Sequence, residues 1–568
     1  MKRLRLIAIV TVLALIFSTA SAFACTGMYV GKDVSAEGTT VIARSEDQGS
    51  GSYNKMFYVI PAEKKAGRYF VDEGEDQNGF KVALPEETYK YTTLADATDA
   101  GDGMYPASCM NEYGLAVIGT ISAGVKEAFE EADPYQETGT GLREAIIPGL
   151  VCCQAKTARE AVEVLGALTD EYGSEEGNIL LFADKNEAWI FESYGGHTYA
   201  AMRLPSDKVA VFGNQFMIGV VDQNDTENYF FSKNLFSTID KAGAVKEGGK
   251  YNLVKSIEGT REEYSNMRNW IGVKTLAPSR VKGFNNNFFY GLCYPPDFKV
   301  SVLDLMKLYG NRYEGTPQDM EKNPGNRPIG VTRQSDIHII QIFDQLPDDS
   351  CALQWLAMGN AEHAVFVPAF SGITDTFDAY KVDKNEYNEA SMYYACKRLC
   401  GLAESDRAFL SQGVKDFNLL QEKIMLDDVM ARLPEVQKAY ASGTATGRAY
   451  VTNMAKEYAK TQFENTTPLY NSLMVTFLDN INDRTNNQRK HTFVADVKVA
   501  DVAKYLGGNA SGSKNVSFTA GGSTYTFSEG SAVCTKRTGN KTTEVELSKA
   551  AFMQNGALYI PMDAVAEL

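Results

Sequence analysis

Alternation of hydrophobic and polar positions predicts two β-hairpins in the first part of the chain. Residues 27–33 (GMYVGKD) and 39–47 (TTVIARSED) are rich in β-branched and aromatic side chains, and the turn between them contains Gly. Residues 107–121 (ASCMNEYGLAVIGTI) repeat this pattern around a turn at Asn111–Gly114. Antiparallel pairing in the first hairpin is expected to bring residues 44–47 back beside its opening residues.

The pattern then changes to helical periodicity and back. Residues 140–172 have the spacing of an amphipathic helix, and we expect an interruption near Pro148. From about 230 to 380 the chain is mixed. The further strand-like segments are 178–204 (two strands around a turn at Asp184–Asn186), 208–219, 336–343 and 363–370.

The last third of the chain has two parts. Residues 388–478 are mostly helical and charged, whereas the final stretch of about 70 residues is β-rich. In that stretch, residues 507–515 (GGNASGSKN) predict a loop, residues 516–528 predict strands, and the Asn555–Gly556 turn precedes another strand. There is no internal repeat.

Composition limits the classes of function. The chain has 568 residues, of which 44% are hydrophobic and 11% aromatic, so it is able to build a large core. Its 72 Asp and Glu against 56 Lys and Arg give a net charge of −16, which argues against nucleic acid as a partner.

The first 24 residues have the three parts of a signal peptide. Basic residues begin the chain, residues 6–17 form an apolar run too short to span a bilayer, and Ala22-Phe23-Ala24 offers a cleavage site. We therefore expect a Sec-type leader (1–24), an exported protein that is extracellular or at the cell surface, and no stable membrane insertion after the leader is removed.

Nine cysteines are sparse in a chain of this length, and they lack the spacing of a disulfide framework. We interpret most of them as small buried side chains. The four histidines, His197, His338, His363 and His491, have no metal-binding spacing, and His197 in a GGHT turn is interpreted as a structural or surface residue.

Cys25 would become the first residue if the leader is cut after Ala24. Its α-amine, with a pKa of about 7.7 to 8.0, would then lie beside its own thiol, with a pKa of about 8.5. One residue would therefore supply both a nucleophile and a general base. Arg44 is a candidate to favour the thiolate, and Asp47 to orient the amine. From spacing alone, Arg44, Glu46 and Asp47 also fit a solvated strand end.

The stretch CTGMYVGKDVSAEGTTVIARSEDQ (25–48) resembles the opening of the dipeptidase family of N-terminal-nucleophile hydrolases, relatives of penicillin V acylase and bile salt hydrolase. Further similar blocks follow in the same order, among them MNEYGLAV, FADKNEAWIFESYGGHTYAAMRLPSDKVAVFGNQFMIG and RPIGVTRQSDIHIIQ. The resemblance implies a four-layer αββα sandwich (an α+β fold) over 25–480, with a helical carboxyl-terminal extension and no metal or cofactor.

The same resemblance implies the site residues. Cys25 is expected to be the nucleophile, with Arg44 and Asp47 beside it, and Asn214 of GNQFMIG an oxyanion donor. The Asn that supplies a second donor in the acylases is absent here, which leaves Thr120 as a candidate. Arg333 and His338 are candidates for a distal basic residue. The implied reaction passes through a thioester.

Two alternatives stay open. An acylase that cleaves N-acyl amides would use the same nucleophile. A dipeptidase, in contrast, needs an acid such as Glu46 or Glu192 to bind the free amine of its substrate. A lipoprotein acylated at Cys25 would be a membrane-anchored binding module, although Leu is missing at position −3 and Phe23 is bulky. The expected substrate is thus a dipeptide or another small amide.

Residues 495–568 resemble the small repeat named after the copper amine oxidase N-terminal domain, mostly through NGALYIPMDAVAEL. The segment contains no His, so the resemblance does not imply copper. We interpret it as an accessory module for surface or partner contact, or as a folded cap. A homo-oligomer also stays open.

Overall fold

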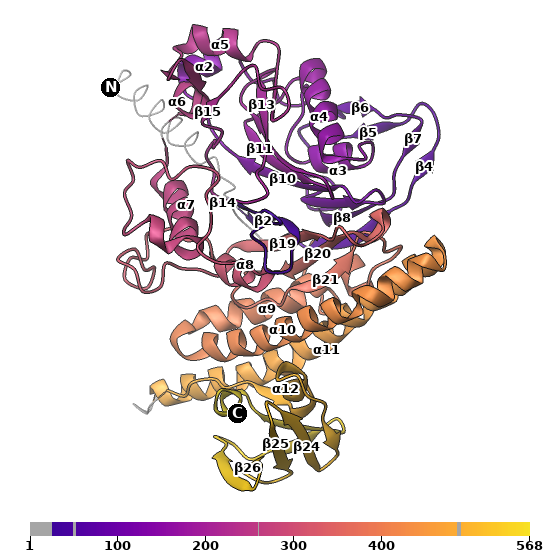
Figure 1. Ribbon diagram of the computed structural model, residues 1–568, viewed down its shortest axis with the longest axis vertical. Coiled ribbons are helices and arrows are strands. Elements are labelled where there is room, and N and C mark those ends of the chain that lie inside the picture. The colour runs from indigo at the N-terminus through magenta and orange to yellow at the C-terminus, as the bar shows by residue number, and fades with distance from the viewer. Residues whose placement is uncertain (1–24, 49–52, 260, 486–489) are drawn as a thin grey trace, which may run out of the picture.

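The computed structural model describes residues 25–48, 53–259, 261–485 and 490–568. Two antiparallel sheets form its centre (Figure 1). The six-stranded sheet has the order β14 (Val209–Phe212), β1 (Thr26–Val30), β2 (Thr40–Asp47), β19 (Gln334–Ile342), β20 (Ala352–Met358) and β21 (Val367–Phe370). The eight-stranded sheet has the order β16 (Tyr229–Phe231), β13 (Tyr199–Arg203), β12 (Ala188–Ser193), β11 (Asn178–Ala183), β10 (Ala116–Ser122), β9 (Ser108–Asn111), β8 (Tyr91–Asp96) and β3 (Lys55–Ile60).

The sheets stack face to face, with β2 against β10 and β11. Helices α3 (Ile147–Cys152) and α4 (Ala158–Tyr172) pack on the outer side of the eight-stranded sheet. Helices from later in the chain cover the other sheet. Helix α7 (Glu263–Leu276) contacts β14, and α9 (Met392–Ser405), α10 (Arg407–Ala441) and α11 (Thr444–Thr485) contact β20 and β21 (Figure 1). Because both of its faces are covered, every residue of β2 is buried.

Smaller elements complete the main body. Its remaining helices are α2 (Glu127–Ala132), α5 (Leu235–Ala242), α6 (Leu253–Ile257) and α8 (Val302–Tyr309). Short strands form β4 (Glu63–Lys64) with β7 (Glu87–Thr88), β5 (Tyr69–Val71) with β6 (Lys81–Ala83), and β15 (Val220–Val221) with β18 (Lys250–Asn252) and β17 (Lys246–Glu247).

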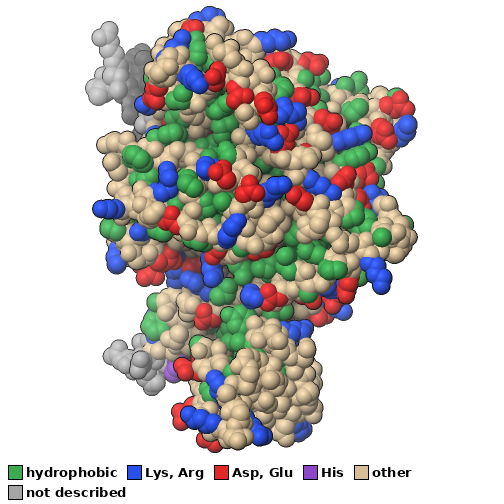
Figure 2. All heavy atoms as spheres, viewed as in Figure 1, with side chains coloured by type: hydrophobic (Ala, Val, Ile, Leu, Met, Phe, Trp, Pro, Cys, Tyr) green, Lys and Arg blue, Asp and Glu red, His purple; other side chains and the backbone are tan. Residues whose placement is uncertain are grey.

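A β-rich module follows the long helices. It combines α12 (Val499–Tyr505), a five-stranded sheet and a three-stranded sheet. The strands are β23 (Ser511–Gly512), β24 (Asn515–Ala520), β25 (Ser523–Ser528), β26 (Val533–Thr538) and β27 (Lys541–Glu546), with β22 (Asp496–Lys498), β29 (Ala557–Pro561) and β28 (Phe552–Gln554). Its apolar core includes Leu420 of α10, which joins it to the main body. The visible face of this lobe consists mainly of backbone and uncharged polar side chains (Figure 2).

The structure confirms the mixed α+β class with stacked antiparallel sheets, long carboxyl-terminal helices and a β module. The hairpins at 27–47 and 107–121 are present as β1–β2 and β9–β10. Asn555 and Gly556 have φ angles of 48° and 78° and form the turn before β29, since these left-handed values suit Asn and Gly.

Two expectations about elements were wrong in part. Pro148 lies in the first turn of α3, where the missing N–H costs no hydrogen bond, and the helix is interrupted instead between Cys152 and Ala158. The Thr157 side chain then caps α4 by accepting from Glu160 N. Segment 178–204 contains a third strand, β13. The mixed region at 230–380 contains β20, for which the sequence analysis named no segment.

All nine cysteines are free thiols, and all except Cys293 are buried. This agrees with their interpretation as small apolar side chains. The predicted leader lies outside the described residues. Within the described ranges, no helix has both the length and the apolar character needed to cross a bilayer.

Gly27 keeps β1 close to the facing sheet. A Cβ atom at this position would lie 2.6 Å from both Ile121 Cδ1 and Phe212 Cζ. We predict that Gly27→Ala destabilises the fold by about 1 to 3 kcal/mol, because the packed layers must move apart. Thermal denaturation measures the change. Gly283→Ala is the matched control, since no atom lies within 4 Å of its added Cβ. Equal melting temperatures for the two variants would contradict this account.

Candidate active site

Cys25 directly precedes β1 and is completely buried. In the β1–β2 hairpin, Gly27 pairs with Arg44, and side chains alternate along each strand. Arg44 therefore lies on the same face as Cys25, and its Nη2 donates to Sγ over 3.1 Å. The antiparallel register of the hairpin thus brings together two residues separated by 19 positions.

The environment of Sγ favours the neutral thiol. Burial raises the pKa of Cys25 to about 11, Arg44 lowers it, and the charges of Asp47, Glu46 and Glu144 raise it. At neutral pH the thiol therefore needs a base that removes its proton.

Asp47 lies at the end of β2, and its charge acts on the Cys25 thiol. Its Oδ2 accepts from Arg327 Nη2 over 2.9 Å, whereas Oδ1 is buried without a hydrogen-bond partner among the described residues. Burial raises the pKa of Asp47, while the charges of Arg327, Arg268 and Arg333 lower it. The carboxylate therefore has one oxygen available for another donor.

A buried ion-pair network lies behind Arg44. Arg44 Nη1 is 3.4 Å from Glu46 Oε2, and Lys55 Nζ is 2.7 Å from Glu46 Oε1 and 2.5 Å from Asp96 Oδ1. The network joins β2 of one sheet to β3 and β8 of the other. Glu46, considered above as a binder of the substrate amine, is therefore engaged by two cations. It is a buried network member, not part of a solvated strand end.

The two basic candidates lie in different environments. His338 is completely buried opposite Arg44, its Nδ1 is 3.1 Å from Asp336 Oδ1, and burial lowers its pKa. Arg333 is half-buried and has no ion-pair partner among the described residues. Burial and then the charge of Arg327 lower the pKa of Arg333, and the charges of Asp47 and Cys25 raise it. Arg333 is thus the better placed of the two to meet a substrate.

Asn214 follows β14 and is held by Arg268. Arg268 Nη2 donates to Asn214 Oδ1 over 2.9 Å, and its Nη1 donates to the Cys25 carbonyl over 2.6 Å. Asn214 Nδ2 donates to Ser122 O over 2.9 Å. Sequence reasoning missed Arg268. It lies 243 positions from Cys25 on a helix that is buried nearly all round, and no local pattern indicates the contact.

Thr120 is buried in β10, and its hydroxyl donates to Glu144 Oε2 over 2.6 Å. The hydroxyl is therefore committed to a carboxylate, which does not favour Thr120 as an oxyanion donor. Glu144, which the sequence analysis did not single out, also accepts from Ser122 Oγ over 3.2 Å.

Two further polar candidates have structural environments. Glu192 is completely buried, and it accepts from Met217 N over 2.6 Å and from Tyr194 Oη over 2.8 Å. Burial raises the pKa of Glu192 to about 7. His197 Nδ1 lies 2.8 Å from the Thr169 carbonyl oxygen. Among the described residues, no hydrogen bond or ion pair joins either side chain to Cys25.

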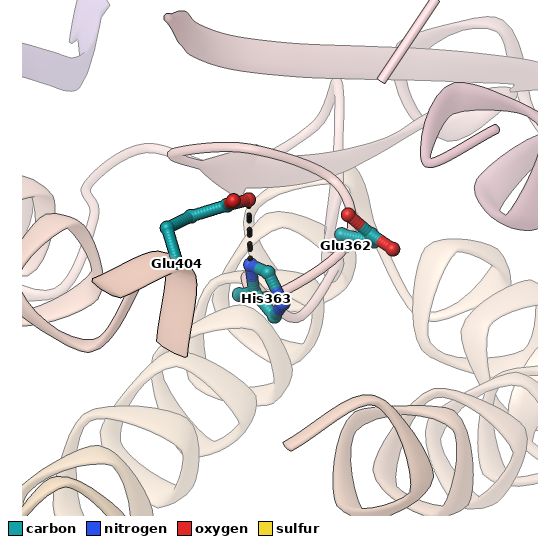
Figure 3. A group of neighbouring side chains, drawn as sticks. All are labelled: Glu362, His363 and Glu404. Carbon is teal, nitrogen blue, oxygen red and sulfur yellow. Dashed lines mark ion pairs between the residues drawn. The ribbon is translucent and has the colours of Figure 1, made fainter. Parts of the chain in front are cut away.

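Glu362, His363 and Glu404 form the one described group with metal-ligand geometry (Figure 3). His363 Nδ1 lies 3.4 Å from Glu404 Oε1, and Glu362 is paired with Arg407, with Arg312 at 2.7 Å and with Lys415 at 2.9 Å. Burial raises the pKa of Glu362, but the Arg407 hydrogen bond and the charge of Arg312 together outweigh this effect and lower the pKa to about 2. Three cations already balance these carboxylates, so the group does not favour a dication.

Arg44 should control the ionisation of Cys25. We predict that Arg44→Met slows alkylation of Cys25 by iodoacetamide at pH 8 about tenfold or more, because each unit of pKa changes the thiolate fraction tenfold. Arg44→Lys should retain part of the rate, since it keeps the charge but loses the planar fork. Arg537→Met, on the exposed surface of the module, is the control. An unchanged rate in folded Arg44→Met protein would refute the role.

Comparison with known proteins agrees with the resemblance seen in the sequence. Probable dipeptidase B of Streptococcus pyogenes serotype M1 is 33% identical over 396 residues, covering 66% of this chain and 78% of that protein. Probable dipeptidase B of Lactococcus lactis subsp. lactis (strain IL1403) is 29% identical over 469 residues, covering 79% of this chain and 95% of that protein.

The crystal structure of a mutant conjugated bile acid hydrolase from Clostridium perfringens aligns with 64% of this chain and 97% of that chain, at 12% identity. Its TM-score of 0.27 is too low for the similarity to support an inference. The model of the family named Peptidase family C69 matches residues 24–420. The expected family of dipeptidase hydrolases is thereby confirmed, and the chain belongs to peptidase family C69.

Proposed function

We propose that this protein is an exported cysteine dipeptidase in which Cys25, freed by removal of residues 1–24, is both nucleophile and base. The observation that carries the proposal is the 3.1 Å contact of Arg44 with Sγ, next to a buried Asp47 oxygen that has no described donor. The relatives named as probable dipeptidases support a dipeptide as the substrate.

The reaction begins with transfer of the thiol proton to the α-amine of Cys25. The resulting thiolate is stabilised by Arg44 and the ammonium by Asp47 Oδ1, which together offset the high pKa that burial gives the thiol. Sγ attacks the peptide carbonyl carbon, and the ammonium protonates the departing amine as the C–N bond breaks. The amine then takes a proton from water, which attacks the thioester and releases the acid.

Two further residues have roles in this proposal. An Asn214 N–H donates to the oxyanion. Arg268 fixes the orientation of the Asn214 amide by donating to Asn214 Oδ1. Arg333 pairs with the substrate carboxylate, since its guanidinium is half-buried without an ion-pair partner among the described residues.

The proposal extends to organisation. Residues 25–480 are proposed as an N-terminal-nucleophile hydrolase domain of four αββα layers, and residues 495–568 as an accessory module of the copper amine oxidase N-terminal type. The stacked antiparallel sheets with helices on both outer sides support the first assignment.

The charge of the site argues against the lipoprotein alternative. Arg44 donates to Sγ, Arg268 donates to the Cys25 carbonyl, and Arg327 pairs with Asp47. Burying these cations is unfavourable for a binding module that would use Cys25 only as a lipid anchor. Intact-mass analysis separates the cases, because added lipid mass on Cys25 would exclude a free amine.

We predict that Cys25→Ala lowers kcat/KM for dipeptides by on the order of 10⁴-fold or more without changing the melting temperature, while Cys25→Ser keeps a trace of activity. An alanine retained before Cys25 should also silence the enzyme, because the base becomes an amide nitrogen. Hydrolysis rates with the amino terminus verified by mass spectrometry test both points. Full activity of the extended form would exclude the α-amine as base.

A substrate panel distinguishes a dipeptidase from an acylase. We expect hydrolysis of unblocked dipeptides, and rates for penicillin V and conjugated bile salts lower by about 100-fold or more, because an apolar acyl group does not match the charged surroundings. The Cys25→Ala protein is the blank for each substrate. Activity confined to the acyl amides would replace the dipeptidase assignment.

A further inference from the structure

A cavity of about 600 Å³ adjoins the candidate active site at Asn214. Its lining includes Asn214 and Tyr264. Both contact Arg268, the residue that donates to the Cys25 carbonyl. Arg268 therefore links the cavity wall to the Cys25 backbone, and the cavity is large enough for an amino-acid residue with a long side chain.

Negative charge dominates this cavity. Its lining contains one basic residue, Arg261, and six acidic ones: Glu130, Glu144, Glu175, Glu176, Glu258 and Glu262. A cavity of this charge repels anions and raises the local concentration of cations.

Several of these carboxylates are already satisfied. Glu258 is paired with Arg261 at 2.5 Å, and Glu175 Oε1 accepts from three backbone N–H groups of residues 139–141. Glu176 Oε1 accepts from Glu144 N over 2.9 Å. Burial and the charge of Glu144 raise the pKa of Glu176 to about 8, so it is mostly neutral at pH 7.

Glu144 remains as a buried carboxylate without a cation. It is 6% exposed, it accepts only from hydroxyl groups through Oε2, and no described Lys or Arg pairs with it. Among the lining acids its charge has the largest effect on the Cys25 thiol. An acid that binds the substrate ammonium must lie near Sγ, because the ammonium nitrogen of a dipeptide is only about 2.5 Å from the carbonyl carbon that Sγ attacks.

Gln215 supplies an independent indication of a ligand. It lines the same cavity and is 3% exposed, and its Oε1 has no hydrogen-bond partner among the described residues. A buried amide oxygen without a donor is costly, and a bound N–H group would remove that cost.

Building on the proposed function, we propose that the cavity binds the amino-terminal residue of the dipeptide, with its free α-ammonium between Glu144 and Gln215. One ammonium does not balance the lining charge, because the exposed Glu130 and Glu262 add negative charge farther out. Lys or Arg is therefore the favoured amino-terminal residue, since its side-chain cation extends toward these two acids.

The test measures kcat/KM of the mature enzyme for Lys-Ala, norleucyl-Ala and Nα-acetyl-Lys-Ala. Acetylation removes the ammonium and should lower kcat/KM by about 10- to 100-fold, as expected for a lost hydrogen-bonded charge. Replacing Lys by norleucine, which keeps the length without the charge, should lower it several-fold.

Variants locate the effect. Glu144→Gln should lower kcat/KM for Lys-Ala about tenfold or more, mainly through KM, and should shrink the penalty of acetylation. Gln215→Leu should act in the same direction, and Glu262→Gln should reduce the preference for Lys over norleucine. Glu163→Gln, on the exposed side of α4, is the control, and titration of Cys25 with iodoacetamide verifies an intact nucleophile.

The outcomes separate this inference from the proposed function. Equal kcat/KM for free and acetylated substrates, or an unchanged acetylation penalty in both Glu144→Gln and Gln215→Leu, overturns the ammonium site while leaving the Cys25 dipeptidase intact. Equal kcat/KM for Lys-Ala and norleucyl-Ala overturns the preference for basic residues. Absence of any Cys25-dependent dipeptide hydrolysis overturns the proposed function itself.

Discussion

The ion pairs that surround Arg44 are the interaction on which the rest of the site depends. A guanidinium buried between two sheets is unfavourable unless an anion compensates it, and here Glu46 does so, while Cys25 Sγ accepts one of its hydrogen bonds. Glu46 in turn requires Lys55, and Lys55 requires Asp96 of the facing sheet. The charge next to the nucleophile is therefore held by the same contacts that fix the distance between the sheets, so the site and the sandwich are stabilised together.

Local pattern predicted where the residues of the first hairpin lie but not their role, because the same spacing also fits a solvated strand end. The turn at 33–38 sets the register that brings Arg44 to Cys25, and this register was readable from the sequence. The long helices after residue 388 were equally readable, because their periodicity is sustained. Family resemblance added Asn214, whose position beside the site no spacing rule predicts.

The rest of the site depends on contacts between distant segments. Arg268 and Arg327 reach Cys25 and Asp47 from 243 and 280 positions away, and Glu144 comes from the loop before α3. Glu46 and Glu192 illustrate the same limit, because their local sequence is compatible with a substrate-binding acid. Only the tertiary neighbours, Lys55 in one case and backbone N–H groups in the other, reveal that both carboxylates are structural.

The free cysteines have a practical consequence. Burial raises the pKa values of seven thiols outside the site, those of Cys152, Cys153, Cys293, Cys351, Cys396, Cys400 and Cys534. These thiols stay protonated in neutral buffer, and all of them except Cys293 are buried, so they contribute little background to covalent labelling. Cys25 differs from them because, in the proposed mechanism, its own α-amine takes the thiol proton. An electrophilic probe would therefore label Cys25 preferentially, and the chain would need no engineered reporter of a free amino terminus.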